Sequence, residues 1–237
     1  MDRPDAPPLT ATAFLATLHA AADDTERVKI RRYITRDDVD NQVIGVRMRT
    51  LFDLAKAAVA MPLDEVEELL ESPFHEGRLG AVSILDAKAR RTDADRVALA
   101  DLYLRRHDRI TSWDMVDRAA PHVLGRYLAG GTYDVLHELA ASADPLRRRS
   151  AITAPLWFVR YGSADDLAAA FALAAVLAAD EEEPVARAVG IALKHAGVRD
   201  EAALLTFLDE HAARLSRIAL REATAKLEPA ARRRYLS

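Results

Sequence analysis

Apolar residues recur at helical spacing through almost the whole chain. In the segment VIGVRMRTLFDLAKAAVA, one stripe of a helix collects the apolar residues, namely Val43, Val46, Leu51, Leu54 and Ala58. Few segments alternate apolar and polar residues, as a half-exposed strand would. The spacing therefore predicts an all-α protein of about twelve helices joined by short connections.

A weak internal repeat runs through three segments. They are SPFHEGRLGAVSIL (72–85), SADPLRRRSAITAPL (142–156) and DEEEPVARAVGIAL (180–193). Each has a polar start, a basic stretch and a run of small apolar residues; the residues in register are Ala81, Ala119 or Ala120, Ala151 and Ala188. A period of about 31 to 39 residues is typical of stacked helix pairs of the HEAT type. We therefore expect HEAT-like helical repeats stacked into a curved solenoid with a concave surface; the alternative is a plain helical bundle.

No shift in composition marks a domain boundary within the helical part of the chain. The N-terminal segment MDRPDAPPL is polar and rich in proline, and it lacks the apolar core of a signal peptide. We expect residues 1–12 to be disordered and residues 13–237 to form a single HEAT-like helical-repeat domain. The longest apolar run, from Leu167 to Ala179, has about 13 residues, short of the roughly 20 that cross a bilayer. No association with a membrane is expected.

The formal net charge of -4 argues against a nucleic-acid partner only as a mean. Acids gather in LDEVEELLE and DEEE, whereas bases gather in VKIRRYITR, YLRRHDR and LRRRS. A mean charge can hide a basic face when the two signs occupy different surfaces. We therefore expect a basic face, although a run such as LRRRS is also consistent with a solvated outer surface.

Several classes of chemistry lack support in the sequence. The chain has no cysteine, which excludes disulfides, thiol nucleophiles and cysteine-bound zinc. None of the seven histidines pairs at a spacing of three or four residues, so no metal site is expected. There is no GxSxG motif, and AGG (129–131) indicates only a loop, so neither acyl transfer nor nucleotide cradling is supported. No cofactor is expected.

The segment SWDMVD combines an aromatic residue and an acid on one face of a predicted helix. Trp113 and Asp117 are four residues apart and therefore neighbours on that face. Ser112 is expected to be the N-cap, and Asp114 a first-turn acid favoured by the helix dipole. Asp117 lies further into the helix, where neither cap nor dipole requires an acid. The alternative for Trp113 is a half-buried packing residue.

The segments SWDMVD, APHVLG and RRRSAI, in this order, resemble the bacterial DNA alkylation repair family, the AlkD-like HEAT-repeat DNA glycosylases. RDDVDNQVIGVRMRTLFDLAKA and LLESPFHEGRLGAVSILDAKAR are also similar to that family, and the similarity runs from about Tyr33 to the end of the chain. The resemblance implies a concave basic groove that binds double-stranded DNA, and excision of N3- or N7-alkylated purines. It also implies a cytoplasmic, nucleoid-associated protein, which we expect to be a monomer.

The resemblance assigns roles to individual residues. Trp113 matches the family's first active-site Trp, and Asp117 matches its catalytic Asp. Arg149 matches an Arg beside the lesion, and its neighbours Arg147 and Arg148 are expected to bind DNA with it.

Further positions of the family fall outside the SWDMVD helix. Tyr33 matches a Tyr that contacts the backbone of the lesion. Ile191 or Ala192 stands where the family has a second Trp, and Leu146 stands where an aromatic residue usually precedes the arginine pair. These substitutions therefore affect the expected catalytic activity more directly than the expected fold.

The chemistry accounts for a ring beside an acid. An alkylated purine already carries positive charge, and its departure moves that charge onto the deoxyribose. A carboxylate stabilises this cation and positions a water, and an aromatic face contributes about 0.5 to 2 kcal/mol. We therefore expect a DNA glycosylase for alkylated purines. The alternatives are a non-catalytic relative that binds bent, branched or damaged DNA, and a protein-interaction scaffold.

Overall fold

The protein is all-α, as the periodicity predicts. The computed structural model describes residues 9–32, 34, 41–91 and 95–236. These residues form sixteen α-helices, two 3₁₀ helices and one π-helical turn, and they contain no strand beyond an isolated bridge between Gln42 and Phe74. The count exceeds the expected twelve because helices as short as α8 (Arg126–Leu128) fall below the roughly 11-residue window that reveals periodicity.

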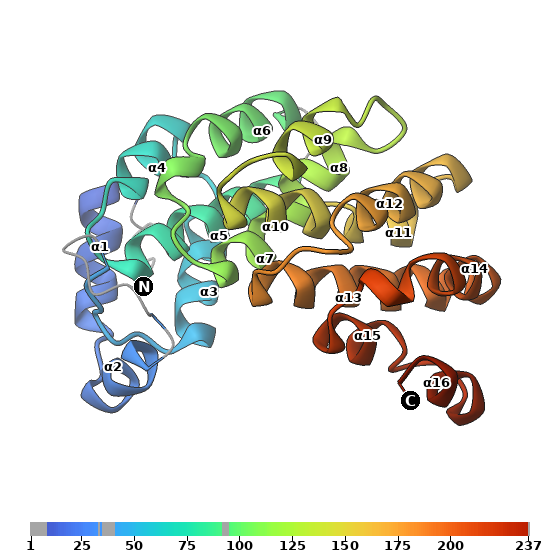
Figure 1. Cartoon of the computed structure of the whole chain (residues 1–237). Helices are drawn as coiled ribbons and strands as arrows, with labels where there is room; N and C mark the ends of the chain where they lie inside the picture. Colours follow the sequence, from blue (N-terminus) through green and yellow to red (C-terminus); the bar gives the residue numbers. More distant parts are fainter. Residues whose placement is uncertain (1–8, 33, 35–40, 92–94, 237) are drawn as a thin grey trace, which may run out of the picture. The chain divides into compact units, whose positions relative to one another are not determined.

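The chain divides into two compact units, Met1–Ala119 and Ala120–Ser237 (Figure 1). The elements that begin in the first are α1 (Ala11–Ala20), α2 (Asp24–Arg31), α3 (Met48–Ala57), α4 (Leu63–Leu70), α5 (His75–Arg91), α6 (Arg96–Arg105), η1 (His107–Arg109) and α7 (Trp113–Ala120). Those of the second are η2 (Pro121–Gly125), α8, α9 (Asp134–Ala140), α10 (Pro145–Thr153), α11 (Leu156–Tyr161), α12 (Ala164–Val176), α13 (Glu183–Arg199), α14 (Glu201–His211), η3 (Ala212–Arg214), α15 (Arg217–Ala223) and α16 (Pro229–Leu236).

The described residues begin at position 9, within the N-terminal segment that was expected to be disordered. Of the N-terminal segment expected to be disordered, residues 1–8 lie outside the described residues, and α1 already begins at Ala11 with that side chain buried. A single domain over residues 13–237, a curved solenoid and a concave basic groove stay predictions. In the described part of the chain, no helix is long and apolar enough to cross a bilayer.

Helix α5 is the centre of the first unit. Helices α1, α3, α4 and α6 pack on it (Figure 1). It buries apolar residues such as Leu79 and Ile84, but also four titratable side chains that are at most 1% exposed, namely His75, Glu76, Arg78 and Asp86. Burying a charge without partners destabilises the folded state by about several kcal/mol. These side chains therefore require partners inside the fold.

Glu76 finds its partners in the loop that leads into α3. Its carboxylate accepts hydrogen bonds from the backbone N–H groups of Ile44, Gly45 and Val46 at 3.0, 2.7 and 3.2 Å. Gly45 has a φ of 98°, and a Cβ there would lie 2.5 Å from the backbone oxygen of Asp23. Only glycine therefore fits this loop, and the buried acid fixes its course.

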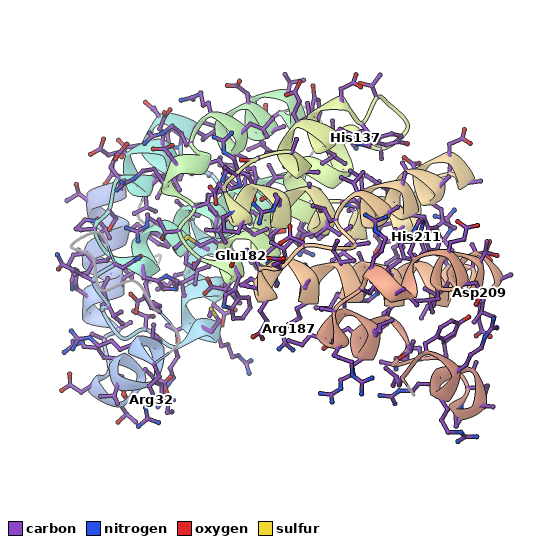
Figure 2. The ribbon with its side chains drawn as sticks, in the orientation of Figure 1. Arg32, His137, Glu182, Arg187, Asp209 and His211 are labelled. Atoms are coloured by element: carbon purple, nitrogen blue, oxygen red, sulfur yellow. The ribbon has the colours of Figure 1, made fainter. Side chains whose placement is uncertain are left out.

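In the second unit, α13 is the helix on which the others pack. It contacts α10, α11, α12, α14 and α15. Figure 2 shows Glu182, at the N-cap of α13, and Arg187 one turn into the helix. The C-terminal α16 is held to α14 by Asp209, whose carboxylate accepts from Tyr235 Oη at 2.6 Å and pairs with Arg234 at 2.8 Å.

A second buried acid, Asp166, organises the start of α12. It forms a capping box with Ser163 and accepts hydrogen bonds from the backbone of Gly130 at 2.9 Å and from Tyr133 Oη at 2.7 Å. Burial, with the contact to Asp166, raises the pKa of Tyr133 to about 12. The loop of residues 129–133, which the sequence identified only as a loop, is thus fixed to α12.

The internal repeat corresponds to a repeated set of hydrogen bonds. The Oγ of Ser72 accepts from the backbone N–H of Phe74 at 3.1 Å, and the carbonyl of Ser72 accepts from Arg78 Nη1 at 2.6 Å. In the second unit, Ser142 accepts from Asp144 N–H at 3.2 Å and from Arg148 Nη1 at 3.0 Å. In each copy, an arginine six residues after a serine thus caps the preceding helix end.

The third segment keeps only part of this pattern. The carboxylate of Asp180 accepts from the backbone N–H of Glu182 at 3.0 Å, which reproduces the turn made by the serines. The position six residues later is Ala186, so the capping arginine is missing there.

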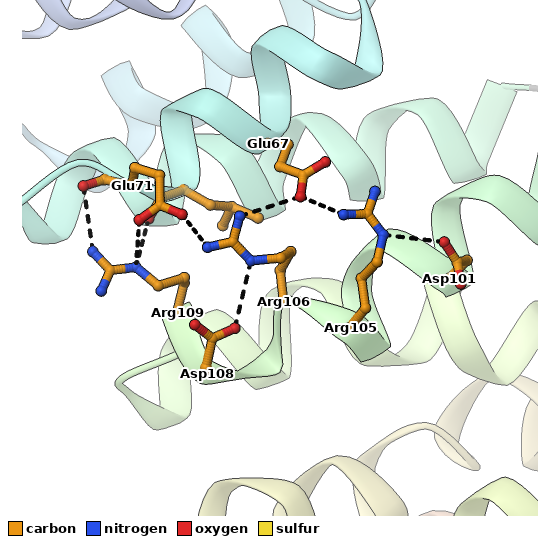
Figure 3. A network of polar contacts seen from close by, with 8 residues as sticks. Glu67, Glu71, Asp101, Arg105, Arg106, Asp108 and Arg109 are labelled. Carbon is orange, nitrogen blue, oxygen red and sulfur yellow. Dashed lines mark hydrogen bonds and ion pairs between the residues drawn. The ribbon is translucent and has the colours of Figure 1, made fainter.

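The separation of acids and bases along the sequence does not make separate surfaces in the first unit. Glu67 and Glu71 of the LDEVEELLE segment lie among the arginines of YLRRHDR (Figure 3). Arg105 and Arg106 both contact Glu67, and Arg106 and Arg109 both contact Glu71. The hydrogen bond from Arg105 lowers the pKa of Glu67. The expectation that YLRRHDR contributes to a basic face is therefore wrong, because its charges are neutralised across α4 and α6.

We predict that Glu76→Gln lowers the free energy of unfolding by about 1 to 3 kcal/mol, because the new amide group leaves a buried backbone N–H without an acceptor. Urea unfolding followed by circular dichroism measures the change as a shift in midpoint at constant slope. The matched control is Glu68→Gln on the exposed side of α4. Equal midpoints for the two variants would contradict the role given to Glu76.

Candidate active site

Helix α7 carries the aromatic–acid pair, and side chains of α5 hold it from one side. Arg78 Nη2 donates to Thr111 Oγ1 at 3.1 Å, just before the helix. Further along, His75 Nε2 lies 3.2 Å from Asp114 Oδ2, and Arg118 Nη2 lies 3.1 Å from Asp86 Oδ2. The positions 111, 114 and 118 recur at helical spacing, so α5 contacts one face of α7 along its length.

The two residues singled out by the sequence lie away from these anchors. Trp113 is 45% exposed, and Asp117 is partly exposed one turn later. Met115, Val116 and Ala119 form the apolar face of the helix and are fully buried. The alternative of a half-buried packing role for Trp113 is compatible with this exposure. The ring of Trp113 and the carboxylate of Asp117 are thus both partly accessible on α7.

The N-terminus of α7 differs from expectation in one respect. Ser112 immediately precedes α7 and so occupies the N-cap position as expected, but its hydroxyl donates to Asp114. The backbone N–H of Met115 donates to the same carboxylate at 3.0 Å. Asp114 thus supplies the capping oxygen, because its carboxylate is the stronger acceptor.

The acidity of Asp114 follows from these contacts. Burial is the largest single effect and would raise its pKa, but the contact with His75, the Ser112 hydroxyl and the Met115 N–H together lower it. The carboxylate is consequently the form that holds the start of α7.

The other end of the anchor is an arginine that lies between two helices. The guanidinium of Arg118 lies 4.1 Å from the centre of the Phe52 ring of α3 and contacts Asp86 of α5. Asp86 is fully buried and also accepts two hydrogen bonds from Arg90 Nε, both at 2.9 Å. Helices α3, α5 and α7 are thereby joined through one carboxylate.

The three arginines of LRRRS lie in α10 of the second unit and differ sharply from one another. Arg148 donates to both oxygens of Asp180 and to the carbonyls of Ser142 and Ala143, at 2.6 to 3.2 Å. Arg149 is 3% exposed and donates to the carbonyl of Pro184, at the start of α13. Arg147 is partly exposed, and no hydrogen bond or ion pair joins it to another described residue. Of the three, Arg147 is the one whose donors are available.

The substituted positions separate into surface and core. Ile191 is partly exposed on α13, whereas Ala192 is 3% exposed. A Trp at position 191 would therefore stay out of the core, whereas a Trp at position 192 would enter it. Leu146 is partly exposed on α10, and Tyr33 lies outside the described residues.

Sequence reasoning missed the residues that hold the site. His75, Asp86 and Arg118 received no role, although each contacts another helix. The available signal was the presence of charged residues within the small-apolar run of α5, where periodicity predicts burial. No cluster of three His, Asp or Glu able to hold a metal ion lies within the described residues.

Comparisons with known proteins agree with one another. A family model described as "DNA alkylation repair enzyme" matches residues 14–227. A solved structure, "Predicted DNA alkylation repair enzyme from Enterococcus faecalis", is similar with a TM-score of 0.64 and 16% identity, over 88% of this chain and 97% of that chain. At this identity, the likeness establishes the fold alone. No curated protein matches the chain.

We predict that Asp114→Asn lowers the free energy of unfolding at pH 6 by about 1 to 3 kcal/mol, the usual contribution of hydrogen bonds to a charged group. Folding lowers the pKa of Asp114, so its stabilising contribution is complete above the ordinary value of about 3.9 and is lost as the pH falls through the folded value. The difference between wild type and variant should therefore shrink below about pH 4. Denaturant unfolding at several pH values measures it, with Asp134→Asn at the exposed start of α9 as control; a difference independent of pH would refute the assignment.

Proposed function

Because the chain belongs to the DNA alkylation repair enzyme family, we propose that it is a DNA glycosylase that hydrolyses the N-glycosidic bond of positively charged N3- or N7-alkylated purines in duplex DNA. The observation that carries this proposal is the side of α7 that bears Trp113 and Asp117. Trp113 is 45% exposed and Asp117 is partly exposed, while contacts from α5 to Thr111, Asp114 and Arg118 hold the helix and the residues just before it. A ring and an acid fixed in this way suit a cationic reaction better than a packing role.

The proposed reaction begins with the departure of the base. The bond between C1′ and the purine nitrogen breaks, and its electron pair goes to the base, which becomes neutral. Positive charge then develops on C1′ and the ring oxygen of the deoxyribose. The Asp117 carboxylate stabilises that charge, and removal of such an electrostatic stabiliser typically costs about 100- to 1000-fold in rate.

Water completes the proposed reaction. A water molecule held by Asp117 attacks C1′, and its proton passes to the carboxylate and then to solvent. The products are the free base and an abasic site. Trp113 places a π face near the cation, which contributes about 0.5 to 2 kcal/mol. The reaction consumes only water, so it requires no cofactor.

Ile191 in place of the second Trp changes the expected rate of this reaction but not its chemical steps. The absent second ring would remove about 0.5 to 2 kcal/mol of stabilisation, equivalent to about 2- to 30-fold in rate. Because Asp117 is retained, the larger contribution is retained too. The smaller side chain also leaves more room, which bears on the size of adduct accepted.

Arg147 is the proposed phosphate contact of α10. Phosphate contacts fix position on the duplex without reading its sequence. Arg148 and Arg149, whose donors meet Asp180 and Pro184, act in this proposal by positioning α10 against the start of α13. A single chain supplies every group that the proposal uses, so we propose that it acts as a monomer, on the DNA of the nucleoid.

A second function is favoured by one observation. Ile191 in place of the second ring suits a relative that binds bent, branched or damaged DNA without excising a base. Excision of a methylated base separates the two functions, since only the glycosylase releases it.

We predict that Asp117→Asn reduces release of N7-methylguanine from methylated duplex DNA by at least about 100-fold, with DNA affinity nearly unchanged, because the substitution removes the charge and keeps the shape. Base release is measured by chromatography under single-turnover conditions. Asp134→Asn, an exposed acid in the first turn of α9, should release base like the wild type. Near wild-type release by Asp117→Asn would show that another group is catalytic, and no release by the wild type on any alkylated purine would favour the second function.

We predict that Arg147→Gln weakens duplex binding and lowers the slope of log K against log salt concentration by about one, the value for one phosphate contact. Arg148→Gln is the contrasting variant, since it should lower the melting temperature and leave the salt slope near that of wild type. Fluorescence anisotropy over a range of salt concentrations measures both slopes. A slope unaltered by Arg147→Gln would place this arginine away from DNA.

A further inference from the structure

A cavity of about 480 Å³ lies in the first unit, between α3, α5 and the Arg118 side of α7. Its lining contains neither Trp113 nor Asp117, so it is separate from the candidate active site. Apolar contributions come from Phe52, Val59 and Ala87. The volume falls in the range of about 300 to 1,000 Å³ that is typical of sites for small molecules.

Cations outnumber anions in this cavity. Lys56, Arg90, Arg91 and Arg118 line it, together with two carboxylates, which gives four positive and two negative charges and a sum of +2. Of the carboxylates, Asp86 is fully buried and engaged by two arginines, and Asp53 is exposed with Arg49 4.0 Å away. Both carboxylates are therefore close to arginines. Their negative charge does not prevent an anion from binding in the cavity.

Two of the cations are held in place before any ligand arrives. Arg90 uses only its Nε on Asp86, so the described contacts leave both Nη groups available. Arg118 is fixed by Asp86 and by the Phe52 ring, and its buried Nε has no hydrogen-bond partner. Burial, and to a smaller extent the neighbouring Arg90, lower the pKa of Arg118, whereas Asp86 raises it. A desolvated cation beside a second cation is stabilised by a bound anion.

We propose that this cavity binds a phosphomonoester carried by a nucleoside. A phosphomonoester has a charge of about −1.5 to −2 at neutral pH, which matches the sum of the lining, whereas a phosphodiester has only one charge. A bare phosphate would leave most of the volume and the whole apolar lining unused. Deoxyribose and base account for that remainder. Two sources supply this chemistry, a free nucleotide and the terminal phosphate of a DNA strand, and the site is independent of the proposed glycosylase activity.

Calorimetric titration of the full chain with deoxyadenosine monophosphate, deoxyadenosine and inorganic phosphate tests the site. We expect the monophosphate to bind at least about tenfold more tightly than either fragment, since each fragment lacks one set of contacts. Lys56→Gln and Arg90→Gln should each weaken that binding about five- to tenfold. Lys56 is exposed, so its variant keeps the fold even if Arg90→Gln loses stability.

The control is Arg105→Gln, which removes the same charge from the ion-pair network of α4 and α6 and should leave the affinity unchanged. A nicked duplex with a 5′-phosphate, compared with one bearing a 5′-hydroxyl, separates the sources. A preference for the phosphorylated nick that Lys56→Gln abolishes assigns the site to DNA ends, and its absence assigns the site to free nucleotides. No binding of the monophosphate, or equal affinity of wild type and Lys56→Gln for it, overturns the proposal. None of these readouts depends on base excision.

Discussion

The burial of charged side chains on α5 is the constraint on which the first unit depends. Glu76, Arg78 and Asp86 are at most 1% exposed on a helix that α1, α3, α4 and α6 cover. Each would destabilise the fold by about several kcal/mol if it had no partners. This is comparable to the whole net free energy of unfolding of a typical domain. Some partners come from α5 itself or from the turn before it, as with Arg90 for Asp86 and Ser72 for Arg78. The others come from the loop before α3 and from both ends of α7. The polar contacts of one helix thus determine the positions of two others.

This arrangement has a direct bearing on the candidate site. A helix of eight residues such as α7 is marginal in isolation. Three contacts to α5 compensate by fixing the face formed by residues 111, 114 and 118. These contacts position the helix that carries Trp113 and Asp117.

The sequence predicted what depends on a single helix and missed what depends on two. Helical spacing gave the all-α class and placed Trp113 and Asp117 on one face, because both follow from a period of 3.6 residues. The hydroxyl of Ser112 was given the capping role that Asp114 has, and the arginines of YLRRHDR were counted toward a basic face. The second error arose because the deciding partner is not in the local pattern: Glu67 is 38 residues from Arg105. The pairing of Arg148 with Asp180, 32 residues away, was equally invisible in the local pattern. Composition shows that opposite charges exist, but only the packing of helices decides which of them meet.

The arginine that follows a serine by six residues has a consequence for how such chains present themselves to a polyanion. Arg78 and Arg148 add to the long-range positive potential, yet their N–H groups already point at the carbonyls of a helix end. Charge and donor capacity are therefore separate quantities in this protein. All the arginines contribute to the electrostatic potential that attracts an anion from a distance. Only arginines whose N–H groups do not cap a helix end, such as Arg147, can donate hydrogen bonds to the anion at contact. The long-range attraction of an anion and its hydrogen bonding at contact can therefore change independently. The first depends on net charge, and the second can depend on a single exposed side chain.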